Sequence, residues 1–305
     1  MPAYNVAPYI GETLDSVFAQ TFSDYEVIIV NDGSPDTVEF ERVLGPYMGR
    51  LRYMKQSNLG AGAARNEGVR AARGEFIAFL DSDDLWLPNY LEEQLKFIRE
   101  NNFDLVCADA MHFGDTPLAG KTYMEAYMPT AGDIGQLTFL GLLSDEQSLI
   151  TSGILARRAH IIEVGLFDEG LRNSQDFDLW LRLVRYGIRS GYQRRLLLRY
   201  RSHKNSLSGD EINRAARQLR VYHKIESSFD LTPEERTVVS RMKKKIGALH
   251  EVELSKSYLS QGRFAEARAA VTKANSYQRS WKLRGVKLFL LVAPRLLRRM
   301  HAWRS

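Results

Sequence analysis

The sequence predicts an α/β fold, a mainly parallel sheet flanked by helices, followed by an all-helical C-terminal region. Over about the first 200 residues, apolar β-branched runs alternate with segments of helical periodicity. Such alternation is typical of parallel sheets that are covered on both faces. From about residue 209 onward only helical periodicity remains. The 305 residues are enough for two domains, and we expect them over residues 1–208 and 209–305.

The predicted elements follow one another along the first domain. Ile10, Leu14 and Val17 share one face of an opening helix. Strands are expected over residues 25–30, 76–80 and 105–110, and further helices over residues 61–72 and 89–101. The last of these helices directs Leu95 and Ile98 inward. Because ligands bind beyond the carboxyl ends of parallel strands, polar residues that follow the strands are candidates for a site.

The start of the chain raises a separate expectation. A sheet of this kind needs a central strand that leads into the segment around Tyr4, and residues 1–3 are too few to form one. Without that strand, the neighbouring strands would expose unpaired backbone groups. We therefore expect Met1 to be an internal methionine, preceded by about ten residues that include a β-branched strand. Residues 1–6 do not resemble a signal peptide.

Charge and cysteine content exclude several classes of protein. All acidic residues lie at or before Glu266, so residues 1–266 carry a net charge of −5 and residues 267–305 carry +10. The high pI of 9.2 belongs to this tail, which removes most of the support for nucleic-acid binding. The single Cys107 cannot form an internal disulfide. A cytoplasmic protein is therefore the default expectation.

The basic tail has two interpretations. Apolar residues such as Trp281, Leu288 and Phe289 interleave with its cations. This composition is typical of an interfacial helix attracted to anionic lipid. The alternative is a terminal helix that packs on the body and leaves its basic face solvated. No uncharged apolar stretch of about 18 residues is present, so we expect no membrane-spanning helix.

The strongest local signal is the acidic turn Asp81-Ser82-Asp83-Asp84, directly after an apolar strand. Carboxylates so close together repel one another unless a cation lies between them. Hard oxygen ligands suit Mg²⁺ or Mn²⁺, with phosphates of a substrate completing the coordination. The alternative is an acidic turn in which Asp84 caps the next helix.

Asp32 and Arg65 are weaker candidates. Asp32 either fixes a turn before Gly33 or accepts a hydrogen bond from a ligand N–H group. Arg65 is either a surface residue of its helix or an anion contact near the helix N-terminus. The segment from Gly60 to Arg65 is close to a dinucleotide-binding fingerprint. Arg65, however, takes the place of the third glycine, where a side chain obstructs packing of helix on strand.

Several motifs in order resemble those of family 2 glycosyltransferases with the GT-A fold. They are Pro2-Ala3-Tyr4-Asn5, Val30-Asn31-Asp32-Gly33-Ser34, Asn58-Leu59-Gly60 with Ala64-Arg65-Asn66, Phe79 to Trp86, Gln175 to Arg182, and Tyr200-Arg201-Ser202-His203. The resemblance covers about residues 1–208. It implies inverting transfer of a sugar from a nucleotide-diphosphate donor of UDP, GDP or dTDP type.

The resemblance also implies roles for individual residues. The nucleotide would be bound by Asp32 at the base, with backbone near Ala3 and Tyr4, by Arg65, and by Asp81 and Ser82 near the ribose. Asp83 would bind the divalent metal, Mn²⁺ or Mg²⁺, and His203 would lie near the diphosphate or the metal. Asp176 would be the general base, with Asp178 as its rival two positions along.

The sequence also departs from the family pattern. Gln175 stands where a Glu is frequent, which we interpret as a change in the surroundings of the acceptor. The Gln-x-x-Arg-Trp motif of processive polysaccharide synthases is absent, so a single addition is favoured.

We therefore expect a metal-dependent, non-processive glycosyltransferase of cell-surface polysaccharide assembly, acting on a glycan or lipid-linked acceptor. It would be peripheral on the inner face of the cell membrane, held by its tail on anionic lipid. The alternative is a non-catalytic sugar-nucleotide-binding or scaffolding protein. Nucleic acid is not an expected partner.

Overall fold

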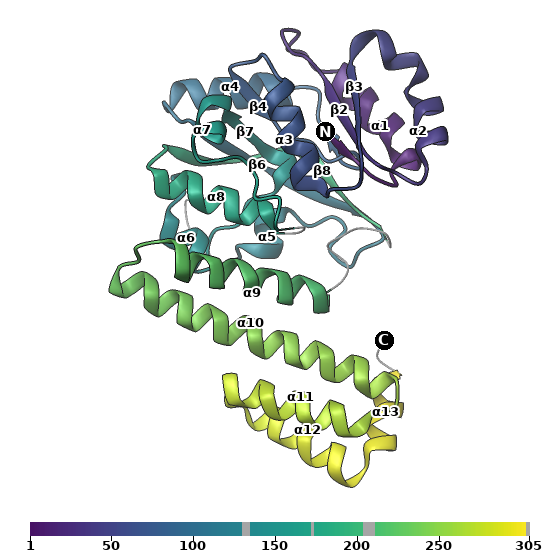
Figure 1. Cartoon of the computed structure of the whole chain (residues 1–305), viewed down its shortest axis with the longest axis vertical. Coiled ribbons are helices and arrows are strands. Elements are labelled where there is room, and N and C mark those ends of the chain that lie inside the picture. Colours follow the sequence, from purple (N-terminus) through teal and green to yellow (C-terminus); the bar gives the residue numbers. More distant parts are fainter. Residues whose placement is uncertain (130–134, 172–173, 204–210, 303–305) are drawn as a thin grey trace. The chain divides into compact units, whose positions relative to one another are not determined.

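The computed structural model describes residues 1–129, 135–171, 174–203 and 211–302. The chain divides into two units, Met1–Ser206 and Leu207–Ser305. The first contains every strand of the described chain and the second only helices (Figure 1). The α/β class and the helical C-terminal region are thus confirmed.

A small parallel sheet opens the first unit. Its order is β1 (Pro2–Ala3), β2 (Ile28–Asp32) and β3 (Arg52–Gln56). Every residue of β2 is buried, because α3 (Ala61–Ala71) places Ala64 against Ile28 and Val30. β2 begins and ends later than the strand predicted over residues 25–30, and it includes Asp32, which we had considered as a turn residue. The helices α1 (Ala7–Phe18) and α2 (Thr37–Leu44) complete this half, and α1 buries Ile10, Leu14 and Val17 as predicted.

The second sheet is mixed, which refines the expectation of a mainly parallel sheet. Its order is β4 (Phe76–Ala78), β7 (Ile154–Arg157), β6 (Leu105–Gly114), β8 (Ser190–Ser202) and β5 (Leu85–Trp86). Only β6 and β8 pair in parallel; the other three pairs are antiparallel. The antiparallel pairs involve β5 and β7, two short strands that the periodicity analysis did not detect.

Helices cover this sheet and form the main core. They are α4 (Tyr90–Glu100), α5 (Tyr123–Tyr127), α6 (Phe139–Leu143), α7 (Arg158–Glu163) and α8 (Gln175–Tyr186), with 3₁₀ turns at Gly45–Arg50 and Thr151–Gly153. α4 packs Leu95 and Ile98 against Val106 of β6 and Leu155 of β7, as its inward residues predicted. α4 therefore packs against β6, the partner strand of β8.

The second unit is a set of helices joined by short turns. They are α9 (Glu211–Ser228), α10 (Pro233–Ser260), α11 (Phe264–Tyr277), α12 (Trp281–Val292) and α13 (Pro294–Ala302). Thr232 and Glu235 form a capping box at the start of α10. Leu259, Ala267, Val271 and Leu290 make a core between α10, α11 and α12. In the described part of the chain, no helix has the length and apolar character needed to cross a membrane.

Candidate active site

The acidic turn lies between β4 and β5 and is held by the 3₁₀ turn Thr151–Gly153 and by β8. The buried carboxylate of Asp84 accepts a hydrogen bond from the Ser152 hydroxyl and, at 2.8 Å, one from the Arg201 main-chain N–H. Burial, together with the charges of Asp83 and Asp81, raises the pKa of Asp84 well above its usual range. The N-cap of α4 is Asn89. Asp84 is therefore a buried anchor of the turn, and its interpretation as a helix cap was wrong.

Asp83 pairs with His203 at the end of β8. The Asp83 Oδ2 and His203 Nε2 atoms are 2.9 Å apart, and the His203 ring stacks on Tyr9 of α1 with 4.5 Å between centroids. Burial and the Asp81 charge raise the pKa of Asp83, while His203 opposes the shift. An anion that is costly to bury next to another anion is stabilised by a cation between them. The carboxylate and imidazole together suit a divalent metal.

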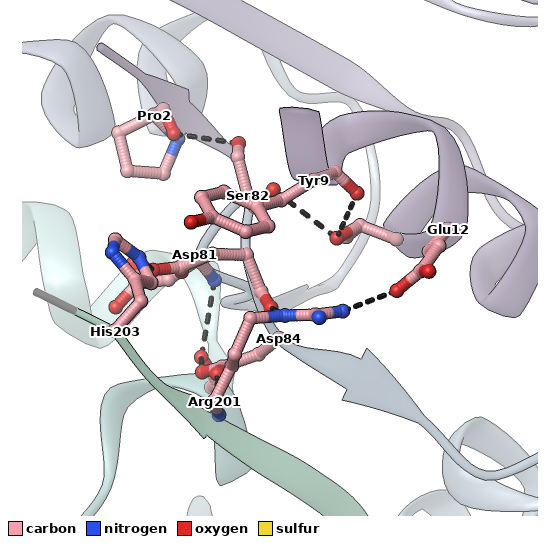
Figure 2. A network of polar contacts seen from close by, with 11 residues as sticks. Pro2, Tyr9, Glu12, Asp81, Ser82, Asp84, Arg201 and His203 are labelled. Atoms are coloured by element: carbon pink, nitrogen blue, oxygen red, sulfur yellow. Dashed lines mark hydrogen bonds and ion pairs between the residues drawn. The ribbon is translucent and has the colours of Figure 1, made fainter. Parts of the chain in front are cut away.

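Arg201 ties this turn to α1 (Figure 2). Its Nε donates to the Asp83 carbonyl oxygen at 2.7 Å, and its terminal nitrogen donates to Glu12 at 2.5 Å. Its guanidinium also lies over the Tyr9 ring. Arg201 belongs to the motif Tyr200-Arg201-Ser202-His203, which assigns it no role of its own. The signal that marks it is its place next to Ser202 and His203 at a strand end.

Arg65 is buried in α3 and faces three carboxylates. Its guanidinium contacts Asp81 at 2.5 Å. Burial opposes the charged form, but the charges of Asp81, Asp176 and Asp83 outweigh it and raise the pKa of Arg65. The interpretation as a surface residue was therefore wrong. Because one guanidinium cannot neutralise three carboxylates, the cluster keeps an excess negative charge that attracts a cation.

Asp176 reaches the same cluster from the first turn of α8. Its Oδ2 accepts a hydrogen bond from the Thr151 hydroxyl at 3.1 Å, and the residue is half-buried. A Cβ added to Gly62 would lie 3.1 Å from the Gln175 side chain, so this glycine allows α3 to approach α8 closely. Asp178, the rival base, is buried and bound to Arg182 at 2.8 Å. The half-buried Asp176 is the better placed of the two for contact with a substrate.

Asp32 lies apart from the acidic cluster, at the end of β2. Its buried carboxylate accepts hydrogen bonds at 2.8 Å from the main-chain N–H groups of Leu59 and Gly60, directly before α3. The turn itself is closed by Asn31, whose side chain accepts from the Ser34 N–H at 2.8 Å. Asp32 therefore orders the approach to α3 rather than fixing the turn that we had considered.

Ser82 connects the acidic turn to β1. Its hydroxyl donates to the Pro2 carbonyl at 2.7 Å (Figure 2). Ala3 is buried, whereas Tyr4 is 48% exposed. The residues that lie together at the site are Arg65, Asp81, Asp83, Asp176 and His203. Ser82 belongs to the same turn and contacts β1. Tyr4 and Asp32 lie at the ends of β1 and β2.

The metal hypothesis rests on two protein ligands. Among the described residues, no group of three His, Cys, Asp or Glu side chains is arranged to hold an ion. Asp83 and His203 form a pair only. Mg²⁺ and Mn²⁺ sites commonly use one or two protein ligands and complete the shell with substrate phosphates and water. The donor set therefore fits a cation that binds together with a phosphorylated substrate.

Residues 1–161 match the sequence profile described as Glycosyl transferase family 2. The chain belongs to this family. A glycosyltransferase of Rickettsia felis is 33% identical over 189 residues, covering 61% of this chain and 31% of that protein. This chain thus matches about a third of the length of that relative. TuaG of Bacillus subtilis, named for teichuronic acid biosynthesis, is 30% identical over 74% of this chain and 86% of its own.

Solved structures share the fold. Residues 1–349 of S. aureus TarS in complex with UDP-GlcNAc superimpose with a TM-score of 0.64 at 19% identity, covering 90% of this chain and 79% of that chain. The Pyrobaculum calidifontis mannosyltransferase PcManGT, in complex with GDP-Man and Mn²⁺, gives 0.61 at 18% identity, covering 99% and 82%. This family 2 chain therefore has a GT-A-like core followed by helices.

Proposed function

We propose that this protein transfers a sugar, with inversion, from a nucleotide-diphosphate sugar to a glycan or lipid-linked acceptor. The observation that carries the proposal is the convergence of Arg65, Asp81, Asp83 and Asp176 on one site. Inverting displacement needs one base for the acceptor hydroxyl and a positive environment for the departing diphosphate. Asp176 is the candidate for the base, and a cation held by Asp83 is the candidate for the positive charge.

Asp176 is the proposed general base. It is half-buried, and its carboxylate is oriented by the Thr151 hydroxyl at 3.1 Å. Thr151 donates to Oδ2, and the main-chain N–H of Phe177 donates to Oδ1 at 2.8 Å. Both oxygens are therefore oriented, and each keeps a second lone pair that can accept from the acceptor hydroxyl. Asp178 is unsuited to the role because Arg182 neutralises it in the interior. The proton of the acceptor hydroxyl thus passes to Asp176 as that oxygen forms its bond to the sugar.

The donor is held by the residues around the acidic turn. Asp83 and His203 would hold Mn²⁺ or Mg²⁺, and the cation supplies positive charge beside the diphosphate when bound. Arg65 and Asp81 line the nucleotide, with Ser82 keeping the turn against β1. Ala3, Tyr4 and Asp32 are the proposed contacts of the base, because they lie at the ends of β1 and β2.

The wider role is assembly of cell-surface polysaccharide by single additions. The relative named for teichuronic acid biosynthesis supports this assignment. UDP, GDP and dTDP sugars are all candidate donors. The structural neighbours support the first two, since one is in complex with UDP-GlcNAc and the other with GDP-Man.

A donor panel tests the proposal. Purified protein is incubated with UDP-, GDP- and dTDP-sugars, each with Mg²⁺, Mn²⁺ or EDTA, and nucleoside diphosphate release is measured. We expect release from one nucleotide class, dependent on the metal. Saturable binding of a donor without any release would instead favour the non-catalytic sugar-nucleotide-binding protein.

The C-terminal tail is the proposed contact with an anionic membrane surface at the inner face of the cell membrane. One side of α12 is buried through Leu290, yet its opposite side exposes Trp281, Leu288 and Val292, at 78%, 60% and 74%. A groove of about 880 Å³ next to it is lined by basic and apolar residues, including Arg284 and Leu288. Exposed apolar residues flanked by cations are typical of interfacial helices.

A further inference from the structure

A basic groove of about 710 Å³ lies along α10 in the second unit, where the C-terminal end of α11 also lines it. We call it the α10 groove. Its lining contains four cations, Arg236, Arg241, Lys244 and Lys245, and no acidic residue. Positions three, four and eight residues apart share one face of a helix, so these cations lie side by side. The α10 groove shares no lining residue with the groove beside α12.

Two of these cations have no acidic partner in the part of the chain that the structure describes. Arg241 and Lys244 are exposed, and neither makes an ion pair there. Elsewhere on α10, outside the groove, Lys243 and Lys256 are each held by a glutamate at 2.6 Å. Like charges three or four residues apart destabilise a helix. An anion in the groove would relieve this repulsion.

The rest of the lining is polar or aromatic rather than aliphatic. The Ser240 hydroxyl and the Gln278 amide make no hydrogen bond with other described residues, so both can bond to a ligand. The groove beside α12, in contrast, is lined in part by Leu288 and Leu291. Acyl chains therefore suit the groove beside α12, whereas the α10 groove suits a ligand rich in hydroxyl groups.

Tyr277 adds one flat apolar surface to this polar lining. Its ring packs on α10 at Gly247, where an added Cβ would lie 3.2 Å from the Tyr277 Cε2 atom. The side chain is still 38% exposed and lines the groove. The C–H groups on the face of a sugar ring pack on such an aromatic face. Single-stranded nucleic acid stacks successive bases on several rings, and the lining of this groove contains one.

We propose that the α10 groove binds a glycan whose sugar units carry carboxylate or phosphate groups. Arg241 and Lys244 bind the anionic groups through charge-assisted hydrogen bonds, and Tyr277 packs on a sugar ring. The four cations extend over about 14 Å of helix, which matches charges repeated along a chain better than a single ion. The choice of a glycan rests on the proposed function, and the groove makes the acceptor of that function an anionic glycan.

Binding of labelled oligosaccharides to the full chain tests the proposal. The probes are an oligogalacturonate, a phosphomannan fragment and a neutral malto-oligosaccharide of equal length, each followed by fluorescence anisotropy without donor or metal. We expect saturable binding of an anionic glycan, at least about tenfold tighter than that of the neutral one and weaker as salt rises. The anionic probe that binds identifies the group as carboxylate or phosphate.

Paired substitutions locate the binding on α10. Arg241→Gln with Lys244→Gln should weaken it about tenfold, because two exposed ion pairs with the glycan are lost. Lys243→Gln with Lys256→Gln is the matched control, which removes two cations from the same helix outside the groove and should change affinity by less than about twofold. Tyr277→Leu should weaken binding about fivefold, whereas Tyr277→Phe keeps the ring and should bind like the wild type.

Several results would overturn the proposal. They are no binding of either anionic glycan, equal weakening by the two paired substitutions, and full affinity of Tyr277→Leu, which would leave charge attraction alone. Tighter binding of polyglutamate or oligodeoxythymidylate would assign the groove to acidic protein or nucleic acid instead. Because no nucleotide sugar is present, a failure here leaves the donor panel unaffected. A failure of the donor panel likewise leaves the glycan binding in place.

Discussion

The two units use charge in opposite ways. At the candidate active site of the first unit, charged residues are buried and held by specific partners, as Arg65 is by Asp81 and Asp84 by the Ser152 hydroxyl. In the second unit, cations and large apolar side chains stand together at the surface of α12, and no acidic residue follows Glu266 in the sequence. Buried polar groups with fixed partners are suited to chemistry, since their orientation is set before a substrate arrives.

This comparison shows why the net charge of a chain is a poor guide to the charge of its active site. The whole chain has a net charge of +5, yet its candidate active site carries excess negative charge. Exposed cations are screened by salt and act over a surface, whereas buried carboxylates act on one ligand. This difference between the two units can be tested with substitutions in one unit at a time.

The largest effect is expected from Asp176→Asn in the first unit. The amide keeps the shape of the side chain and its contact with Thr151 but cannot accept the acceptor proton. Transfer should fall by about 10²–10⁴-fold, the usual contribution of a positioned base. Donor affinity should stay near the wild-type value. Single-turnover transfer and donor titration measure the two quantities.

Asp178→Asn is the matched control for that experiment. It removes the buried carboxylate that pairs with Arg182, so the free energy of unfolding should fall, while the folded fraction keeps most of its transfer rate. Full transfer by the Asp176 variant would contradict its role. Selective loss of transfer in the Asp178 variant would move the base there.

The second largest effect is expected from a change at Asp83, the proposed metal ligand. Asp83→Asn should lower donor binding and transfer together, by about 10²-fold, because a charged ligand beside the diphosphate is lost. High Mn²⁺ should restore part of both. Donor titration at several Mn²⁺ concentrations checks this, with Glu12→Gln as a control that changes an exposed carboxylate on the same network. Unchanged Mn²⁺ dependence in the Asp83 variant would remove that residue from the site.

Much of the fold could be predicted because burial leaves a periodic pattern. α4 was expected within one residue of each end, since Leu95 and Ile98 repeat at helical spacing and are buried. β5 and β7, with two and four residues, are too short to show a period. β8 was not predicted either, although it has 13 residues, because its buried and exposed positions do not alternate. The mixed character of the second sheet depends on these strands, so strand direction could not be predicted either.

The individual residues of the site could be predicted, but the contacts that join them could not. The acidic turn was visible because carboxylates following an apolar strand are costly without a partner. The contacts of Arg201 with Asp83 and Glu12 join residues far apart in sequence, and no local pattern encodes them. The alternatives for Asp84 and Arg65 were decided by burial, which a single sequence does not fix for an individual polar residue.

A smaller effect is expected from the surface of the second unit. Trp281→Ser with Leu288→Ser removes two exposed apolar side chains without touching the buried Leu290. Affinity for vesicles containing anionic lipid should fall by about tenfold, because the two side chains together contribute on the order of 1.5 kcal/mol when partly buried in the interface. Donor turnover should be unchanged. Vesicle sedimentation measures the affinity, and wild-type binding should weaken as salt rises.

The control for this surface comes from the other unit. Val38 is 87% exposed on α2, where Glu39 and Glu41 are its neighbours in sequence and Arg42 is paired with Glu39. Val38→Ser therefore removes an exposed apolar side chain outside the basic tail. It should leave vesicle affinity unchanged. Deleting residues 279–305 should abolish binding to anionic vesicles. Equal binding by the deleted and intact chains would show that the tail is not a membrane contact.

The smallest effect is a pH dependence inside the first unit. His112 of β6 is 1% exposed among Tyr123 and Tyr200, and burial lowers its pKa below 6.5, with Asp109 opposing the shift. Below pH 6.5, His112 therefore binds a proton more readily in the unfolded chain than in the native chain. The free energy of unfolding should fall as the pH drops from 7.5 to 5.5, by at most about 1.4 kcal/mol per pH unit for this one group.

His112→Phe keeps an aromatic ring in the same packing and removes the titration. Urea unfolding at both pH values should therefore show a smaller difference for this variant than for the wild type. The exposed His223→Gln is the matched control in the second unit and should leave the wild-type difference intact. If both variants keep the same difference, the pH dependence arises elsewhere. A loss of the pH dependence confined to His112→Phe would assign it to the burial of this one ring in the first unit.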